Sequence, residues 1–222
     1  MTSSTLSARL RAATAAEHAR AESTDWAAAL AAGTAPRAAY AAYIEALEVV
    51  YRSLEASLSA AASDPAVSAV HDLRLERRER LVDDLAAWGT PLHLPAAQAA
   101  AAAYADRIST AAGLDPVLLV AHHYVRYLGD LSGGQVVAAA MTRRSGGDSV
   151  AGVSFYDFTS LLSPTSRGGS SLVPYVRGYR DALDGLALDE ARTQAVAAEA
   201  VRSFQLTIDL FSALQPALQP VL

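Results

Sequence analysis

The sequence of 222 residues contains neither cysteine nor lysine. Without cysteine there can be no disulfide, thiolate metal site, iron–sulfur cluster or cysteine nucleophile. Without lysine there can be no Schiff-base catalysis and no phosphate-binding loop that depends on a lysine. All 18 basic residues are arginine and 23 residues are acidic, which gives a net charge of -5. This charge argues against a nucleic-acid-binding protein, which usually presents a basic face.

Long apolar segments are absent as well. No run reaches the roughly 18–20 apolar residues that a transmembrane helix needs. Residues 1–7 lack the basic region and apolar core of a signal peptide, and residues 215–222 are interrupted by Pro216 and Pro220. We therefore expect a cytoplasmic protein that does not associate with a membrane.

No segment alternates apolar and polar residues in the pattern of a β-strand, and no repeat of fixed period is present. Alanine, the strongest helix former, is abundant. We predict an all-α fold in which residues 1–222 form a single compact domain of about eight helices. Apolar spacing and proline or glycine boundaries predict helices over residues 4–22, 36–58, 67–88, 95–112, 117–141, 173–183 and 189–214, with loops at 144–152 and 163–171.

Two of these helices have a predicted buried stripe. In the first helix, residues at three-to-four spacing are Leu6, Leu10, Ala13, Glu17 and Ala21. In the second helix, which is the most strongly periodic, they are Tyr40, Tyr43, Ile44, Leu47, Val50, Tyr51, Leu54 and Leu58.

His18 lies four residues before Glu22 in the first predicted helix, so both side chains lie on one helical face, one turn apart. A carboxylate that accepts the Nδ1 proton would leave Nε2 free as a metal ligand and make the imidazole more basic. The alternative is an exposed His–Glu pair that contributes a few tenths of a kcal/mol, roughly the value of an isolated helical pair.

The other four histidines are weaker candidates for a ligand. His71 and His93 lie in charged or proline-flanked segments, so we expect them on the surface. His122 and His123 are adjacent, and neighbouring residues on a helix point about 100° apart. These two side chains therefore cannot both reach one site, and we expect at least one of them to lie on a helix face or at a cap.

The segment from Tyr124 to Gln135 reads Tyr-Val-Arg-Tyr-Leu-Gly-Asp-Leu-Ser-Gly-Gly-Gln. Its three glycines, Gly129, Gly133 and Gly134, cost a helix roughly 1 kcal/mol each relative to alanine. Either the helix kinks here, or a flat group approaches its backbone. Asp130, between the glycines, needs water or a donor if it is buried. The alternative is close helix–helix packing at the glycines with Asp130 solvated.

This segment resembles the distal-helix signature of the heme oxygenase family. Residues 6–22 resemble the proximal helix of that family, and the order and spacing of the matches hold from Leu6 to about Leu214. The further matches are Tyr51 in Val-Val-Tyr-Arg-Ser-Leu-Glu, Phe155-Tyr-Asp-Phe158, Tyr179-Arg180, and Phe204 with Phe211. The resemblance implies that heme b, as both cofactor and substrate, lies between an N-terminal proximal helix and a glycine-kinked distal helix.

The resemblance also implies roles for residues around the iron. His18 matches the proximal ligand of the heme iron, and Glu22 matches the residue that hydrogen-bonds the other nitrogen of that ligand. Gly129 and Gly133 match the distal glycines that let the helix backbone lie almost on the porphyrin, and Gly134 matches a neighbour that permits the kink.

The remaining distal residues match a hydrogen-bond network. Asp130 matches the carboxylate that anchors water near bound oxygen. Tyr51 and Arg126 match other members of this network, although an ordinary buried tyrosine and a surface arginine would fit the sequence equally well.

At the heme edge, the anionic propionates need cationic partners. Arg11 and Arg180 match the basic contacts of the family, and Tyr124 is assigned to the same cofactor-binding set. Val176 falls where the family commonly has a lysine, and the adjacent Arg177 is the candidate replacement. Phe204 and Phe211 match aromatic pocket positions, whereas Phe158 is assigned to the core.

The resemblance implies a heme oxygenase that uses O2 and external electrons to open heme at a meso carbon, giving biliverdin, carbon monoxide and ferrous iron. The electrons would come from a ferredoxin or an NAD(P)H-dependent reductase, because the sequence has no βαβ unit for a flavin or dinucleotide. We expect a monomer. The alternatives are a heme carrier or sensor without turnover, and a helical interaction domain whose glycines serve packing.

Overall fold

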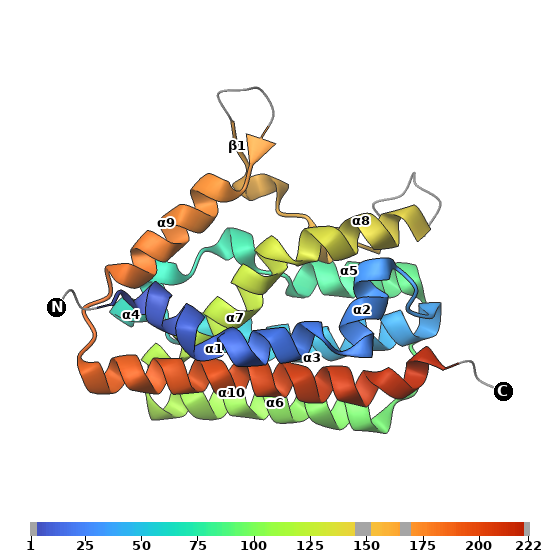
Figure 1. Cartoon of the computed structure of the whole chain (residues 1–222), viewed down its shortest axis with the longest axis horizontal. Helices are drawn as coiled ribbons and strands as arrows, with labels where there is room; N and C mark the ends of the chain where they lie inside the picture. Colours follow the sequence, from blue (N-terminus) through green and yellow to red (C-terminus); the bar gives the residue numbers. More distant parts are fainter. Residues whose placement is uncertain (1–3, 145–151, 165–169, 220–222) are drawn as a thin grey trace.

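The computed structural model describes residues 4–144, 152–164 and 170–219. Within these residues the fold is all-α, as predicted, with ten α-helices (Figure 1). They are α1 (Leu6–Glu22), α2 (Asp25–Ala32), α3 (Arg37–Ala60), α4 (Pro65–Val70), α5 (Arg78–Trp88), α6 (Pro95–Leu114), α7 (Leu119–Ser132), α8 (Gly134–Arg144), α9 (Val173–Asp184) and α10 (Glu190–Leu214). Most of the predicted loop over residues 144–152 lies outside the described residues.

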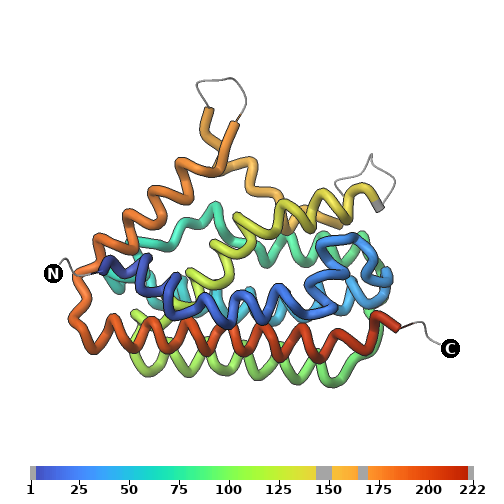
Figure 2. The backbone as a smooth tube through the Cα atoms, in the orientation of Figure 1, coloured from blue at the N-terminus to red at the C-terminus, as the bar shows by residue number. Residues whose placement is uncertain are grey.

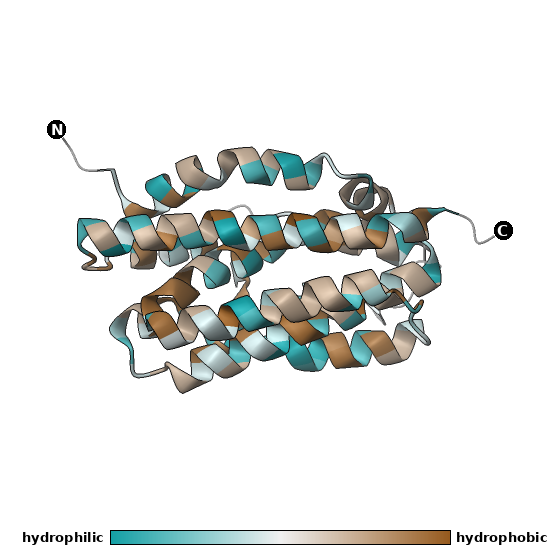
Figure 3. Ribbon diagram, turned by 90° about the horizontal axis from the view of Figure 1, so that it is seen from below, coloured by the Kyte–Doolittle hydropathy of each residue, from teal (hydrophilic) through white to brown (hydrophobic). Residues whose placement is uncertain are grey.

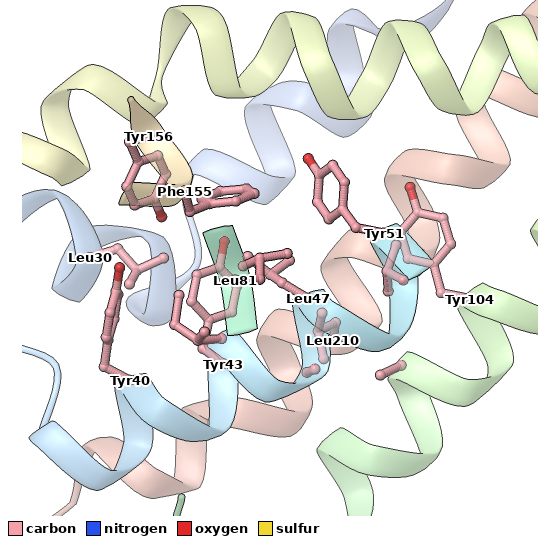
Figure 4. Close-up of a cluster of buried hydrophobic side chains, with 14 of the residues drawn as sticks. Leu30, Tyr40, Tyr43, Leu47, Tyr51, Leu81, Tyr104, Phe155, Tyr156 and Leu210 are labelled. Atoms are coloured by element: carbon pink, nitrogen blue, oxygen red, sulfur yellow. The ribbon is translucent and has the colours of Figure 1, made fainter. Parts of the chain in front are cut away.

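The core is built on α3, which packs against α5 and α6. All eight residues of the predicted stripe on this helix are buried. Tyr40, Tyr43 and Tyr51 project from α3 on the side that faces Phe155 and Tyr156 (Figure 4). Figure 3 shows hydrophobic and hydrophilic residues mixed along the helices, as expected for helices with one buried face. No helix of the described ranges is long and apolar enough to cross a membrane.

Helix α1 lies along α10 and buries a narrower stripe than predicted (Figure 1). Leu6, Leu10 and Ala21 are buried, but Thr14 takes the place that the sequence assigned to Ala13. Ala13 is exposed and Glu17 is only half-buried. Because α1 packs mainly on α10, its opposite face is not covered by the described chain, and the predicted stripe was too wide.

The helix predicted over residues 117–141 is interrupted, and the chain changes direction between α7 and α8 (Figure 2). The amide of Gly133 still donates to the carbonyl of Gly129 at 2.8 Å, but the next amide to bond, that of Val136, reaches back only three residues to Gly133. The first two residues of the prediction belong to a short 3₁₀ turn, Pro116–Leu118, that precedes α7. The kink predicted from the glycines is therefore present.

Two other elements differ from the prediction. Helix α2 was missed, although Thr24 caps its start and Gly33, in the left-handed conformation, ends it. The helix predicted over residues 67–88 is two helices, α4 and α5, separated by a 3₁₀ turn at Leu73–Leu75. The buried side chain of Arg77 holds this break, because its Nε donates to the carbonyl of Leu75 at 2.7 Å.

A minimal sheet also departs from the prediction of no strands. Two-residue strands β1 (Ser163–Pro164) and β2 (Ser170–Ser171) pair antiparallel and form an arm that projects from the helices (Figure 2). The arm leads into α9, of which only Tyr179 and Leu183 are buried.

Candidate active site

His18 lies near the end of α1, with 55% of its side chain exposed. Its Nδ1 lies 3.2 Å from Oε2 of Glu22, as the four-residue spacing predicted. Phe204 of α10 meets the imidazole edge-on, with ring centroids 5.6 Å apart. Nothing in the described chain engages Nε2, so this nitrogen is available to a metal.

The buried histidines are held in other directions. His122 and His123 are both fully buried. Nε2 of His122 lies 2.8 Å from Oε1 of Glu199 on α10, and Nδ1 of His123 lies 2.8 Å from the hydroxyl of Tyr179 on α9. The prediction that they cannot share one site is confirmed.

His93 is exposed, as predicted, but the surface assignment of His71 was wrong. Only 9% of the His71 side chain is exposed. The chain leaves α4 in an extended conformation at His71, and its ring packs edge-on against His123, with centroids 6.0 Å apart. His18 is therefore the histidine of this chain best placed to bind a metal at a helix surface.

A buried network surrounds Asp130 on α7. Only 8% of Asp130 is exposed, so the alternative of a solvated carboxylate is wrong. The hydroxyl of Tyr51 on α3 donates to Oδ2 of Asp130, and Nη2 of Arg126 lies 3.7 Å from Oδ1. The guanidinium of Arg126 also lies over the Tyr51 ring, 5.3 Å from its centroid. The structure thus brings together the three residues predicted for the distal network.

The environment of this network changes the acidity of its carboxyl group. Burial raises the pKa of Asp130 to about 6, although the charge of Arg126 and the hydrogen bond from Tyr51 act in the opposite direction. Arg126 is buried rather than on the surface, and its Nε is without a hydrogen-bond partner in the described part of the chain. The network therefore holds a carboxyl that titrates close to neutral pH and a donor available to a further group.

The three glycines of the distal segment do not share one role. A Cβ at Gly129 would meet nothing within 4 Å, and at Gly133 it would meet only the Gly129 carbonyl at 3.4 Å. These two glycines, one turn apart, therefore leave a strip of backbone facing open space. Such a strip fits a flat macrocycle.

Gly134 is buried instead, and its Cβ would lie 2.7 Å from Cδ1 of Tyr156. Its missing side chain is needed for packing against that ring. The assignment of Gly134 to the cofactor surface is not supported by this placement, whereas the packing alternative describes Gly134 well.

The start of α1, the end of α7 and α9 border a cavity of about 500 Å³. It is lined by apolar residues, by two arginines and by polar or acidic residues, namely Leu131, Leu172, Val173, Val176, Arg177, Arg180, Ser7, Ser132, Asp181 and Asp184. Val176, which occupies the position of the expected lysine, thus contributes an apolar wall, and Arg177 and Arg180 supply the cations.

Tyr124 on α7 interacts with residues of α1 and α9. Burial raises the pKa of its hydroxyl, while a hydrogen bond with Thr14 and the charges of Arg180 and Arg11 lower it. Residues of α1, α7 and α9 therefore gather around one phenol, and two of them are the arginines predicted for the propionates. Thr14 was missed in the sequence, although it lies four residues after the buried Leu10.

The two remaining aromatic residues, Phe211 and Phe158, have different surroundings. Phe211 is half-buried and packs edge-on against Tyr43, with centroids 6.1 Å apart, and its place in the cofactor pocket stays a prediction. Phe158 is buried beneath the guanidinium of Arg77, 4.3 Å from its ring centroid, which confirms the assignment to the core.

A larger cavity of about 700 Å³ lies between α3, α4 and α6. Its walls are alanine, serine and proline, with Asp64 as the one titratable residue. Asp64 already caps α4 through hydrogen bonds to the amides of Ala66 and Val67. The chemistry of the chain is therefore concentrated in the smaller cavity and along α1 and α7.

Comparisons with known proteins identify the family of this chain. The heme oxygenase family model matches residues 4–213. Heme oxygenase 2 of Synechocystis sp. is 32% identical over 216 residues, which cover 95% of this chain and 83% of that protein. Heme oxygenase from Porphyra purpurea is 30% identical and covers 99% of this chain and 90% of its own length.

A solved structure gives the same result. The heme oxygenase-2 of Synechocystis sp. in complex with heme and NO superposes with a TM-score of 0.86 at 30% identity and covers 97% of this chain and 87% of that one. From the fold, the site and these relatives together, the chain belongs to the heme oxygenase family.

Proposed function

We propose that the chain binds heme between α1 and α7 and opens it at a meso carbon, with O2 and external electrons, to biliverdin, carbon monoxide and ferrous iron. The observation that carries this proposal is the pairing of two surfaces. An exposed His18–Glu22 pair lies on α1, and a side-chain-free strip at Gly129 and Gly133 lies beside a buried carboxyl network on α7. Bound heme supplies the iron chemistry that activates oxygen.

His18 is the proposed iron ligand. Glu22 accepts the Nδ1 proton, which fixes the tautomer, leaves the Nε2 lone pair for the iron and makes the imidazole a stronger donor. Phe204 restricts rotation of the ring from the α10 side. The same arrangement of a histidine with a carboxylate on its second nitrogen is common among metal-binding histidines.

Asp130 is the proposed proton-holding group on the distal side. Its carboxyl points toward Tyr51 on α3, so it acts on the open face at Gly129 through a water rather than by direct contact. A pKa of about 6 lets the group hold or release a proton near neutral pH. Arg126 and Tyr51 keep the carboxyl in place and supply donors around it.

The cavity bordered by α9 is the proposed place for the propionates. Arg180, Arg177 and Arg11 provide the positive charge, and Tyr124 lies among them. Because Val176 stands where the family commonly has a lysine, the three arginines must neutralise the negative charge of the propionates.

Electrons are proposed to come from a separate ferredoxin or NAD(P)H-dependent reductase. The described elements form helices and one two-residue strand pair, which leaves no βαβ unit there to hold a flavin or a dinucleotide. The principal rival is a heme carrier without turnover. A carrier has no use for a buried carboxyl with a raised pKa beside the glycine strip, and this observation favours the enzyme.

The test mixes the chain with hemin and then adds a reductant under air, with catalase present to remove free peroxide. Stoichiometric binding, loss of the Soret band and formation of bilin in a single turnover are expected. A Soret band that persists after reduction would refute turnover and favour the carrier. A chain that fails to bind hemin at all would refute both.

A further inference from the structure

Helix α9 carries Arg177 and Arg180 and forms one wall of the 500 Å³ cavity, so its position determines where these cations lie. The helix lies at the edge of the fold, beyond α1 and α4 (Figure 1). Only Tyr179 and Leu183 of α9 are buried. With so little buried surface, the position of α9 depends on a few specific contacts.

Within the described residues, polar contacts at three places join this helix to α1, to α7 and to the segment after α4. At one end, the hydroxyl of Tyr175 donates to Asp72 at 3.2 Å. At the other end, Asp184 accepts hydrogen bonds from the amide and hydroxyl of Ser7 at 2.8 and 2.9 Å. Both of these contacts are at least partly exposed, where water competes for them.

The third contact is fully internal and lies next to Arg180 in the sequence. The hydroxyl of Tyr179 is 2.8 Å from Nδ1 of His123, and the two rings are stacked, 10° from parallel with centroids 5.4 Å apart. Both side chains are buried. Stacking fixes the orientation of the Tyr179 ring, and the hydrogen bond fixes the distance of its hydroxyl from His123. Together they specify the position of α9 relative to α7.

His123 belongs to the same helix as the distal site. Its ring lies 4.5 Å from that of Tyr127, which lies 5.6 Å from that of Tyr51, the residue that holds Asp130. A continuous set of aromatic contacts therefore connects the cation-bearing helix to the carboxyl network.

His123 is uncharged in this setting. Burial and the nearby His71 lower its pKa to about 3, against the opposing charge of Asp72. The contact with Tyr179 therefore stays the same across the physiological pH range and acts as a fixed spacer rather than a switch.

We propose that His123 and Tyr179 are positioning residues that fix α9 against α7 and thereby set the in-plane orientation of heme, and so the meso edge that is opened. This inference rests on the proposed function. Heme carries both propionates on one edge, so the place of Arg180 relative to the glycine strip selects the meso carbon presented there. Because Val176 contributes no charge, the orientation depends more heavily on Arg180.

The test uses variants with small changes in shape. Tyr179→Phe removes only the hydroxyl, and His123→Leu removes the ring nitrogens. His123→Asn places an amide where Nδ1 lies and is the rescue variant. Tyr104→Phe is the matched control, because it removes an equally buried hydroxyl that bonds Ser203 between α6 and α10, away from α9.

Three readouts are combined: amide hydrogen exchange of α9 in the heme-free chain, the heme methyl NMR shifts of the ferric complex, and the biliverdin isomer ratio after one turnover. Tyr179→Phe and His123→Leu are expected to exchange α9 amides about two- to tenfold faster, the range for one hydrogen bond. They should also shift the methyl pattern and the isomer ratio. His123→Asn should return all three toward wild type, and Tyr104→Phe should change none.

Unchanged α9 exchange in Tyr179→Phe would overturn the proposal, since the contact would then not hold the helix. Faster exchange with an unchanged methyl pattern would also overturn it, because the pair would be structural only. If wild type binds hemin but forms no bilin, the proposed function fails, and the exchange and methyl readouts still decide the positioning role.

Discussion

Replacement of Asp130 by asparagine tests the energetics of the distal network. Burial raises the pKa of Asp130 from 3.8 to about 6. A carboxyl that holds its proton more tightly in the folded chain than in the unfolded chain stabilises the fold below pH 3.8, and this contribution is lost as the pH rises through about 6. Asparagine resembles the neutral acid and does not titrate, so Asp130→Asn escapes the loss.

The magnitude follows from about 1.4 kcal/mol per pKa unit. Above pH 7 the charged carboxylate lowers the free energy of unfolding by about 3 kcal/mol relative to the neutral acid, and about half of this penalty is already present at pH 5. When the pH is raised from 5 to 8, the free energy of unfolding of Asp130→Asn should therefore increase by about 1.4 kcal/mol relative to that of wild type. Urea unfolding of the heme-free chain at both pH values, followed by circular dichroism, measures this gain.

Asp106→Asn is the matched control, because Asp106 is exposed on α6 and its substitution removes the same charge from a solvated position. Its effect on the free energy of unfolding should stay within about 0.5 kcal/mol at both pH values. If Asp130→Asn gains nothing between pH 5 and pH 8, the carboxyl is charged at no cost to the fold and the reasoning is refuted. With hemin bound, the same variant should form no bilin, because an amide cannot exchange the proton.

Other variants test the proximal and edge contacts. His18→Ala should lose the imidazole-ligated heme spectrum, while His93→Ala, at an exposed histidine, should keep it; equal spectra would remove His18 from the iron. Gly129→Leu should fold normally but bind hemin at least about tenfold more weakly, because one blocked contact of about 1.4 kcal/mol gives that factor. Gly134→Ala should instead lower the free energy of unfolding by about 1–3 kcal/mol, because its methyl group would overlap the ring of Tyr156. Thermal melts and hemin titrations separate these two effects, and a stable Gly134→Ala would contradict the packing role. Arg180→Gln should weaken hemin binding by about tenfold, typical of one charge-assisted contact, and an unchanged affinity in a hemin titration would place the propionates elsewhere.

Local patterns in the sequence predicted the parts of this fold that depend on neighbours along the chain. The stripe on α3 was correct in full, because a long helix at the centre of the core must bury one continuous face. The His18–Glu22 pair and the kink near Gly133 were correct for the same reason, since a spacing of four residues and a cluster of glycines act within one or two turns.

Features that depend on distant residues were not predictable in this way. The Tyr51–Asp130 hydrogen bond joins residues 79 positions apart, and spacing within one helix carries no information about it. The side chain of His71 is only 9% exposed because its ring packs against that of His123, 52 positions later, although Asp72 and Arg74 follow it in the sequence. The ring of Tyr156 packs against Gly134 but not against Gly129 or Gly133, and no local pattern in the sequence indicates this difference.

The residues assigned to heme share an energetic property that separates them from the core. Gly129, inside α7, lowers helix stability by roughly 1 kcal/mol relative to alanine, and the charged form of Asp130 lowers the free energy of unfolding further. On α1, the side chain of His18 is left 55% exposed. None of these features stabilises the heme-free fold, so their presence is explained by a ligand that recovers the lost stability.

At a hemin concentration of 100 times its Kd, binding stabilises the folded chain by about 2.7 kcal/mol. Substitutions in the site should therefore change stability and turnover in opposite directions. Asp130→Asn should raise the free energy of unfolding of the heme-free chain and abolish turnover. A change in the core, such as one at Tyr104, should lower the free energy of unfolding with and without heme.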